Sequence, residues 1–85
     1  MNVKVLYFGA LREQVGTHEE TVTVSSSAPT VADLMSELTA RGPTWALAMQ
    51  STEPLRIAVD QEMADLNATL RPNSEVAFFR PVTGG

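Results

Sequence analysis

One long apolar stripe lies among several short alternating segments, and this arrangement most constrains the fold. From residue 31 onward, apolar side chains recur at helical spacing, at Val31, Leu34, Met35 and Leu38. Thr30 and Asp33 approximate a capping box before the stripe, and Gly42 with Pro43 ends it. Because one such helix covers a single face of a small sheet, the sequence predicts a two-layer α+β domain.

The other regular segments have the pattern of short strands. Alternating or β-branched composition predicts strands at residues 3–8, 19–25, 55–60 and 75–79, with a shorter one near Met63. A short helix at residues 10–16, stopped by Gly16, separates the first two strands, which we expect to form a hairpin.

Residues 44–50 are ambiguous by pattern. We favour a short helical turn there, with Trp45 and Leu47 closing one end of the core. The turn-forming residues Pro72, Asn73 and Ser74 then lead into the last strand.

Length and composition exclude several classes of function. Eighty-five residues with 44% hydrophobic content describe one small domain. The chain has no cysteine and one histidine, so a thiol nucleophile is excluded and we expect no metal site. A net charge of −4 with scattered basic residues argues against a nucleic-acid partner.

No segment has the pattern of a membrane span or a signal peptide. Lys4 interrupts the first apolar run, and no run approaches ~18 apolar residues. We therefore expect no membrane partner and a cytoplasmic location.

Apolar side chains are expected on both faces of the sheet. If Val3, Val5 and Tyr7 face the helix, then Leu6 and Phe8 face away from it, and the last strand repeats the pattern. On that strand Ala77 and Phe79 face away, and Met63 joins them from the neighbouring hairpin. Such a cluster indicates a partner surface, unless loops or residues 44–49 cover it.

Like the outward-facing apolar side chains, the closing segment RPVTGG is not needed to form the fold. Pro81 cannot donate to a strand ladder, and Val82 and Thr83 favour extended backbone. Gly84 and Gly85 carry no side chain, so they fit a channel too narrow for a Cβ atom. The alternative is an ordinary terminus without function.

The whole chain resembles the MoaD-like sulfur carriers, the small subunits of molybdopterin synthase. The resemblance rests on KVLYFGALREQVGT, PTVADLMSEL, WALAM and above all EVAFFRPVTGG. It implies a ubiquitin-like β-grasp fold: a mixed sheet of four to five strands with one main helix packed on one face. The first and last strands are then central neighbours, residues 1–80 form the domain, and residues 81–85 form a flexible C-terminal Gly-Gly tail.

The resemblance also implies a sulfur-transfer function. The Gly85 carboxylate is adenylated, converted to a thiocarboxylate and donates sulfur to cyclic pyranopterin monophosphate in molybdenum cofactor biosynthesis. The implied partners are a MoaE-like large subunit, a ubiquitin-activating-type (MoeB-like) adenylating enzyme that uses ATP-Mg, and a persulfide donor. The chain itself then binds no cofactor stably and contributes no catalytic side chain to the heterotetramer.

Site residues follow from the same resemblance. Gly85 bears the reacting group and Gly84 permits insertion of the tail, while Phe8, Met63 and Phe79 match the family's apolar docking surface. The remaining partner-binding residues are Arg80, Pro81, Val82 and Thr83. Arg80 departs from the family, which often has a second proline there, and it is expected to loosen the strand exit and add charge near the pocket mouth.

Three alternatives remain open from the sequence. A sulfur carrier for thiamine, cysteine or tRNA thiolation would share fold and tail. A ubiquitin-like protein modifier would be joined to lysines through Gly85, and a plain interaction domain would not need its tail.

Overall fold

In the computed structural model, the described residues, 1–50 and 54–81, form five strands and three helices. Their order along the chain agrees with the sequence prediction. The third helix is longer than expected. The elements are β1 (Asn2–Tyr7), α1 (Gly9–Val15), β2 (Glu19–Thr23), α2 (Val31–Thr39), α3 (Pro43–Gln50), β3 (Arg56–Val59), β4 (Glu62–Ala64) and β5 (Glu75–Phe79).

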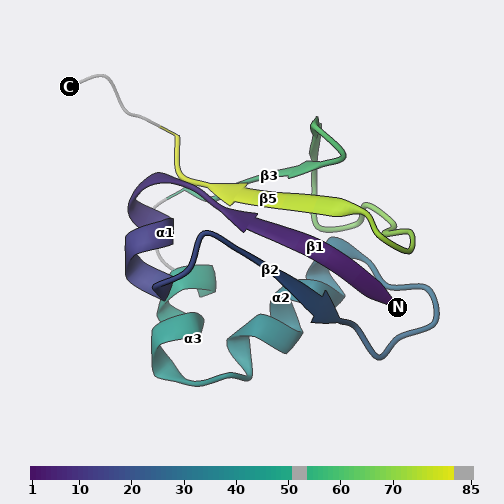
Figure 1. The fold of residues 1–85 in the computed structure, drawn as a ribbon, viewed down its shortest axis with the longest axis horizontal. Helices are drawn as coiled ribbons and strands as arrows, with labels where there is room; N and C mark the ends of the chain where they lie inside the picture. The colour runs from purple at the N-terminus through teal and green to yellow at the C-terminus, as the bar shows by residue number, and fades with distance from the viewer. Residues whose placement is uncertain (51–53, 82–85) are drawn as a thin grey trace.

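The strands form one mixed sheet with β1 and β5 at its centre (Figure 1). Its order is β2-β1-β5-β3-β4, and β1 runs parallel to β5 while the other neighbours are antiparallel. Val5 lies opposite Val76 in the central pair. The expected β1–β2 hairpin is confirmed, and the sheet has the β-grasp arrangement that the resemblance implied.

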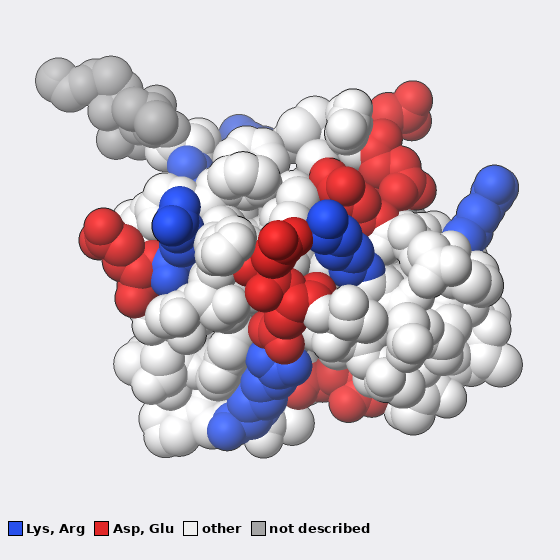
Figure 2. All heavy atoms as spheres, viewed as in Figure 1, with Lys and Arg blue, Asp and Glu red and all other residues white. Residues whose placement is uncertain are grey.

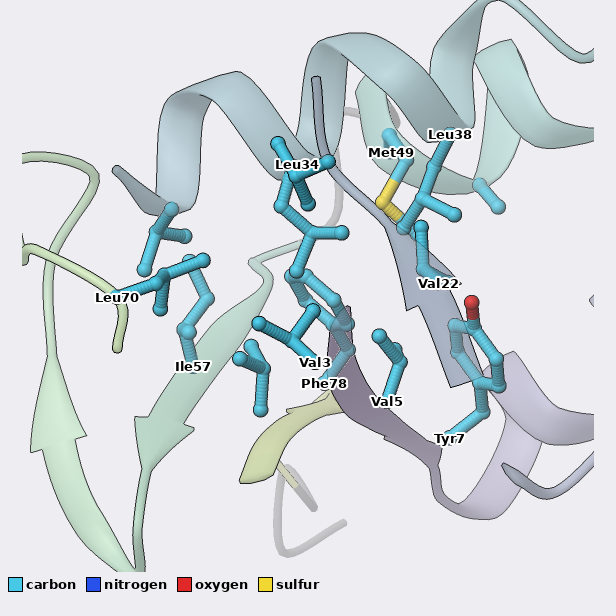
Figure 3. Close-up of a cluster of buried hydrophobic side chains, with 14 of the residues drawn as sticks. Val3, Val5, Tyr7, Val22, Leu34, Leu38, Met49, Ile57, Leu70 and Phe78 are labelled. Atoms are coloured by element: carbon cyan, nitrogen blue, oxygen red, sulfur yellow. The ribbon is translucent and has the colours of Figure 1, made fainter. Parts of the chain in front are cut away.

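The helices lie together on one side of the sheet (Figure 1). Side chains at alternate positions of β1 and β5 point toward them, so Val3, Val5, Tyr7, Val76 and Phe78 are buried as predicted. Figure 3 shows Phe78 and Val5 rising from the sheet toward Leu34 and Leu38 of α2. The core therefore lies between the two layers and leaves the opposite face of the sheet without helices.

Helix α2 begins with the capping box that the sequence predicted. The Asp33 N–H donates to Thr30 Oγ1 at 3.3 Å, and the Thr30 N–H donates to Asp33 Oδ2 at 2.8 Å. Two otherwise unpaired donors of the first turn are thereby satisfied. The apolar stripe faces the core, where Val31, Leu34 and Leu38 are buried.

Helix α3 is longer than the short turn expected at residues 44–50, and the placement of Leu47 was wrong. Ala48 and Met49 are buried against α2 and the sheet, whereas Leu47 is 66% exposed. Leu47 lies on the opposite side of the helix because adjacent residues diverge by about 100° around an α-helix. Trp45 does pack against the core, edge-on to Tyr7 with ring centroids 5.5 Å apart.

Residues with positive φ end α1 and form the turn between β3 and β4. Gly16 ends α1 with φ +81°, as the sequence predicted for a C-cap, and its N–H donates to Arg12 O at 2.9 Å. Asp60 and Gln61 both have positive φ in the hairpin between β3 and β4. This hairpin places Met63 directly opposite Ala58.

The predicted tail lies largely outside the described residues, which end at Pro81. The proposed division into a domain of residues 1–80 and a tail of residues 81–85 therefore stays a prediction. Among residues 1–50 and 54–81, no helix has the length and apolar character needed to cross a bilayer.

Candidate functional site

The outward face of the sheet carries the apolar side chains that the sequence assigned to it. Strand register aligns Leu6, Ala77, Ala58 and Met63 in one row across β1, β5, β3 and β4. Phe79 follows on β5, and Phe8 follows on the chain after β1. We call this set the outer-face patch: Leu6, Phe8, Ala58, Met63, Ala77 and Phe79.

The patch is open to solvent in the described part of the chain. Phe8 is 50% exposed and Met63 is 64% exposed, and the other four members are half-buried. The alternative that residues 44–49 cover this face is wrong, because α3 packs with α1 and α2 on the other side of the sheet. Exposed large apolar side chains in one cluster are typical of an interaction surface.

Two neighbours of the predicted docking residues were not identified from the sequence. Ala58 completes the row between Ala77 and Met63, and Arg56 lies opposite Phe79 on the same face. The alternation within residues 55–60 already placed both side chains on one face of a strand. What the sequence lacked was the strand order, which brings β3 beside β5.

Charged side chains border the patch without forming a field of one sign. Lys4 Nζ lies 3.2 Å from Glu19 Oε2 at the β2 side. Figure 2 shows acidic and basic groups side by side over β1 and β2, in agreement with this pair. Both members of the Lys4–Glu19 pair are solvent-exposed, so the pair adds little stability and leaves the apolar surface as the dominant feature.

The chain leaves β5 at Arg80, whose side chain turns toward the helices. Its Nη2 donates to Ala48 O at 3.0 Å and to Gln14 Oε1 at 3.4 Å. Arg80 and Pro81 are both half-buried. The structure shows the Arg80 guanidinium bonded to these two groups within the chain, and its expected place near the mouth of a partner pocket stays a prediction. The predicted site residues Val82, Thr83, Gly84 and Gly85 lie outside the described residues.

A polar network lies on the helix side, away from the patch. The Tyr7 hydroxyl donates to Glu20 Oε2 at 2.9 Å, and Arg41 donates to both Glu20 oxygens at 2.8 Å. The hydrogen bond from Arg41 lowers the pKa of Glu20, while burial and the Glu20 carboxylate raise the pKa of Tyr7. Tyr7 therefore stays neutral and Glu20 stays ionised near pH 7, so this network suits a structural role in the fold.

A separate apolar hollow, among the residues that the structure describes, lacks reactive groups. This open hollow of about 360 Å³ lies along α2, and its lining residues include Met35, Met49 and Leu66 but no titratable side chain. No group of three His, Cys, Asp or Glu side chains among residues 1–50 and 54–81 is placed to hold a metal ion. The patch and the adjacent exit of β5 therefore remain the strongest site.

Comparison with known proteins gives full-length matches. The model of the ThiS family matches residues 5–85. The chain is 41% identical over 83 residues to the molybdopterin synthase sulfur carrier subunit of Escherichia coli, covering 98% of this chain and 99% of that protein. It is 31% identical to the protein of the same name from Haemophilus influenzae, with the same coverage.

Solved structures confirm the β-grasp fold. SAMP1 of Haloferax volcanii aligns over all of both chains with a TM-score of 0.81 and 24% identity. A putative molybdopterin converting factor subunit 1 from Pyrococcus furiosus aligns at 0.80 and 24% identity, covering 96% of this chain and 99% of that one. A complex of subunits 1 and 2 of the molybdopterin-converting factor from Helicobacter pylori contains a chain that aligns at 0.68 and 22% identity, with full coverage of both.

Proposed function

We propose, because this chain belongs to the ThiS family, that it is the sulfur carrier subunit of a molybdopterin synthase. One observation carries the proposal: the similarity to carriers of that name extends over nearly the whole chain. The cytoplasm, where ATP is available, is the proposed location of its reaction.

The proposed chemistry takes place at the Gly85 carboxylate. A carboxylate is a poor electrophile, so a MoeB-like enzyme first transfers AMP from ATP-Mg to it and releases pyrophosphate. A persulfide then attacks the acyl carbon and expels AMP, and a thiol cleaves the new S–S bond to leave the thiocarboxylate. The thiocarboxylate sulfur then displaces an oxygen substituent on a carbon of cyclic pyranopterin monophosphate, and water cleaves the acyl C–S bond, which leaves the sulfur on the substrate and restores the Gly85 carboxylate.

The composition of the chain supports a main-chain sulfur carrier. With no cysteine in the sequence, sulfur cannot be carried on a thiol side chain. Gly84 and Gly85 present no Cβ atom, so they suit entry into a narrow channel. We propose that the catalytic side chains belong to the partner enzymes.

The outer-face patch is the proposed docking surface for a MoaE-like large subunit and for the adenylating enzyme. Burying a large apolar side chain such as Phe8 or Met63 contributes about 1.5–3 kcal/mol. Ordering each tail residue costs about 1–2 kcal/mol. Patch burial therefore offsets much of the cost of holding the tail, and the Helicobacter pylori complex of subunits 1 and 2 supports a two-subunit assembly. We propose that two copies of each subunit form the heterotetramer.

A second candidate function is protein modification. The structural likeness to SAMP1, a small archaeal modifier protein, favours it. Both functions begin with adenylation of Gly85, and they diverge in whether sulfur or a lysine amine attacks the acyl-adenylate. Isopeptide-linked products in a cell lysate would support the modifier, and their absence alongside thiocarboxylate formation would exclude it.

The test of the carrier function is a charging reaction read by intact mass. The chain is incubated with the adenylating enzyme, ATP-Mg and a persulfide donor, and we expect the mass gain of one oxygen-to-sulfur exchange. Deleting Gly85 should abolish the gain, because the activated carboxylate is displaced, while the melting temperature stays unchanged. If the intact chain keeps its original mass under conditions that charge the Escherichia coli carrier, the proposal is wrong.

A further inference from the structure

The C-terminal end of α3 has an unusual source of positive charge. Carbonyl groups in the last turn of a helix lack partners within it, and Ala48 O lies in the last turn of α3 as the structure describes it, Pro43–Gln50. α3 itself has no basic residue in its last turn. Arg80, from the far end of β5, donates to this carbonyl at 3.0 Å and brings its charge to the negative end of the helix dipole.

Three elements that are distant in the sequence meet at this guanidinium. Gln14 of α1 accepts at 3.4 Å, Ala48 belongs to α3, and Arg80 directly follows β5. Alternation along the strand explains the orientation, because Val76 and Phe78 face the helices and Arg80 continues their side. The next residue, Pro81, restricts the backbone of Arg80 to extended conformations.

We propose that Arg80 is a positioning residue for the sulfur-carrying tail. Its hydrogen bonds to Ala48 and Gln14 fasten the start of the tail to α3 and α1, beside the patch residue Phe79. This inference deepens the proposed carrier function and rests on it.

The expected benefit is a smaller loss of freedom when a partner takes up the tail. Residues that are already held in place lose less conformational entropy on binding. Fastening the start of the tail at Arg80 therefore strengthens association with the adenylating enzyme. We expect the chemical step at Gly85 to be unaffected, because the proposal gives Arg80 no contact with the reacting carbonyl. A positioning role therefore changes the KM for the carrier more than kcat.

The experiment compares Arg80→Met with Arg71→Met in steady-state charging by the adenylating enzyme. Each substitution removes one guanidinium group and one positive charge. Arg80 is half-buried and Arg71 is exposed. Arg71 precedes the turn before β5. We expect Arg80→Met to raise the KM for the carrier about tenfold with kcat within about twofold. Arg71→Met should change neither.

Arg80→Lys separates position from charge alone. A lysine keeps a cation near the helix terminus but lacks the planar fork of donors, so we expect partial recovery of KM. Gln14→Ala removes only the longer hydrogen bond, and we expect a rise in KM of about two- to threefold. The Ala48 carbonyl ¹³C chemical shift should change in Arg80→Met and stay constant in Arg71→Met.

The outcomes distinguish this inference from the function on which it rests. An unmodified mass for the wild-type chain would overturn the carrier function and this inference with it. Normal charging of the wild-type chain with an unchanged KM for Arg80→Met would overturn the role of Arg80 alone. A loss in kcat at constant KM would also overturn it, because positioning of the tail acts on association.

Discussion

Tyr7 shows how one residue joins the core to a polar network. Its ring is buried between Phe78 and Trp45, and its hydroxyl donates to Glu20, which Arg41 also binds. The sequence predicted the burial of Tyr7 from the alternation of β1. It did not predict the partners, because Glu20 lies on β2 and Arg41 lies after α2, and only the packed layers bring them together.

The Tyr7 hydroxyl should stabilise the fold at neutral pH and cease to do so in alkali. Burial first, and then the hydrogen bond with Glu20, raise the pKa of Tyr7. A raised pKa means that this contribution is present below the unfolded pKa of about 10 and is lost as pH rises above it. Tyr7→Phe should therefore cost about 1 kcal/mol in urea unfolding at pH 7 and flatten the fall in stability above pH 10.

Two comparisons test this assignment. In a Glu20→Ala background, Tyr7→Phe should cost less stability at pH 7 than it does in the wild-type chain, because either substitution alone already removes the same hydrogen bond. Equal alkaline slopes for the wild-type chain and Tyr7→Phe would show that the hydroxyl is not held neutral by the fold.

The contacts of Arg80 within the chain were not predicted from the sequence. The sequence identified it as a departure from the family and placed its charge near a partner. Its observed acceptors, Ala48 O and Gln14 Oε1, come from helices that no local pattern connects to β5. Long side chains that cross between elements can be assigned only after the elements are placed.

At the scale of elements, strands and caps were more predictable than α3. Each strand carried its own alternation, and the Thr30–Asp33 box lies within four residues. In α3, by contrast, apolar residues occur all round the helix, including the exposed Leu47. Which of them faces the core is decided by packing against α1 and α2, so the sequence alone could not define its buried side.

The cap of α2 gives a prediction at this scale. Thr30→Ala removes the oxygen that accepts from the Asp33 N–H, so we expect a loss of about 1 kcal/mol in the free energy of unfolding. Thr44→Ala in the first turn of α3 is the matched control, since that side chain is exposed, and we expect a change within about 0.5 kcal/mol. A Thr30→Ala midpoint equal to that of the control in urea unfolding would contradict the prediction.

At the scale of the molecule, the one-sided layer of helices leaves the outer-face patch available. The amphipathic stripe of α2 and the two-faced strands predicted this arrangement from the residues. The order of the strands was implied only by the family resemblance, because pairing between distant segments leaves no periodic signal in either segment. The structure supplies that order and adds Ala58 and Arg56 to the surface.

The patch predicts that binding and stability can be separated. Met63→Ser should weaken binding to the large subunit by about tenfold or more, because an apolar side chain worth about 1.5–3 kcal/mol is no longer buried. The melting temperature should stay unchanged, since Met63 is 64% exposed in the chain alone.

Leu47→Ser provides the control for this prediction. Leu47 is similarly exposed at 66%, but it lies on α3, on the opposite side of the sheet. Titration calorimetry should show wild-type affinity for Leu47→Ser. Equal weakening by both substitutions would mean that the large subunit does not use the patch.

The parallel pairing of β1 with β5 also determines how fast the chain can fold. Val5 must find Val76 across nearly the whole sequence before the centre of the sheet exists. Closing so long a loop costs entropy before any contact returns it, so we expect folding slower than that of helical bundles and faster than that of all-β barrels. Until β5 inserts, β1 and β3 each keep an open edge that another chain can pair with. Insertion of β5 between β1 and β3 therefore closes both edges and removes a route to pairing between chains.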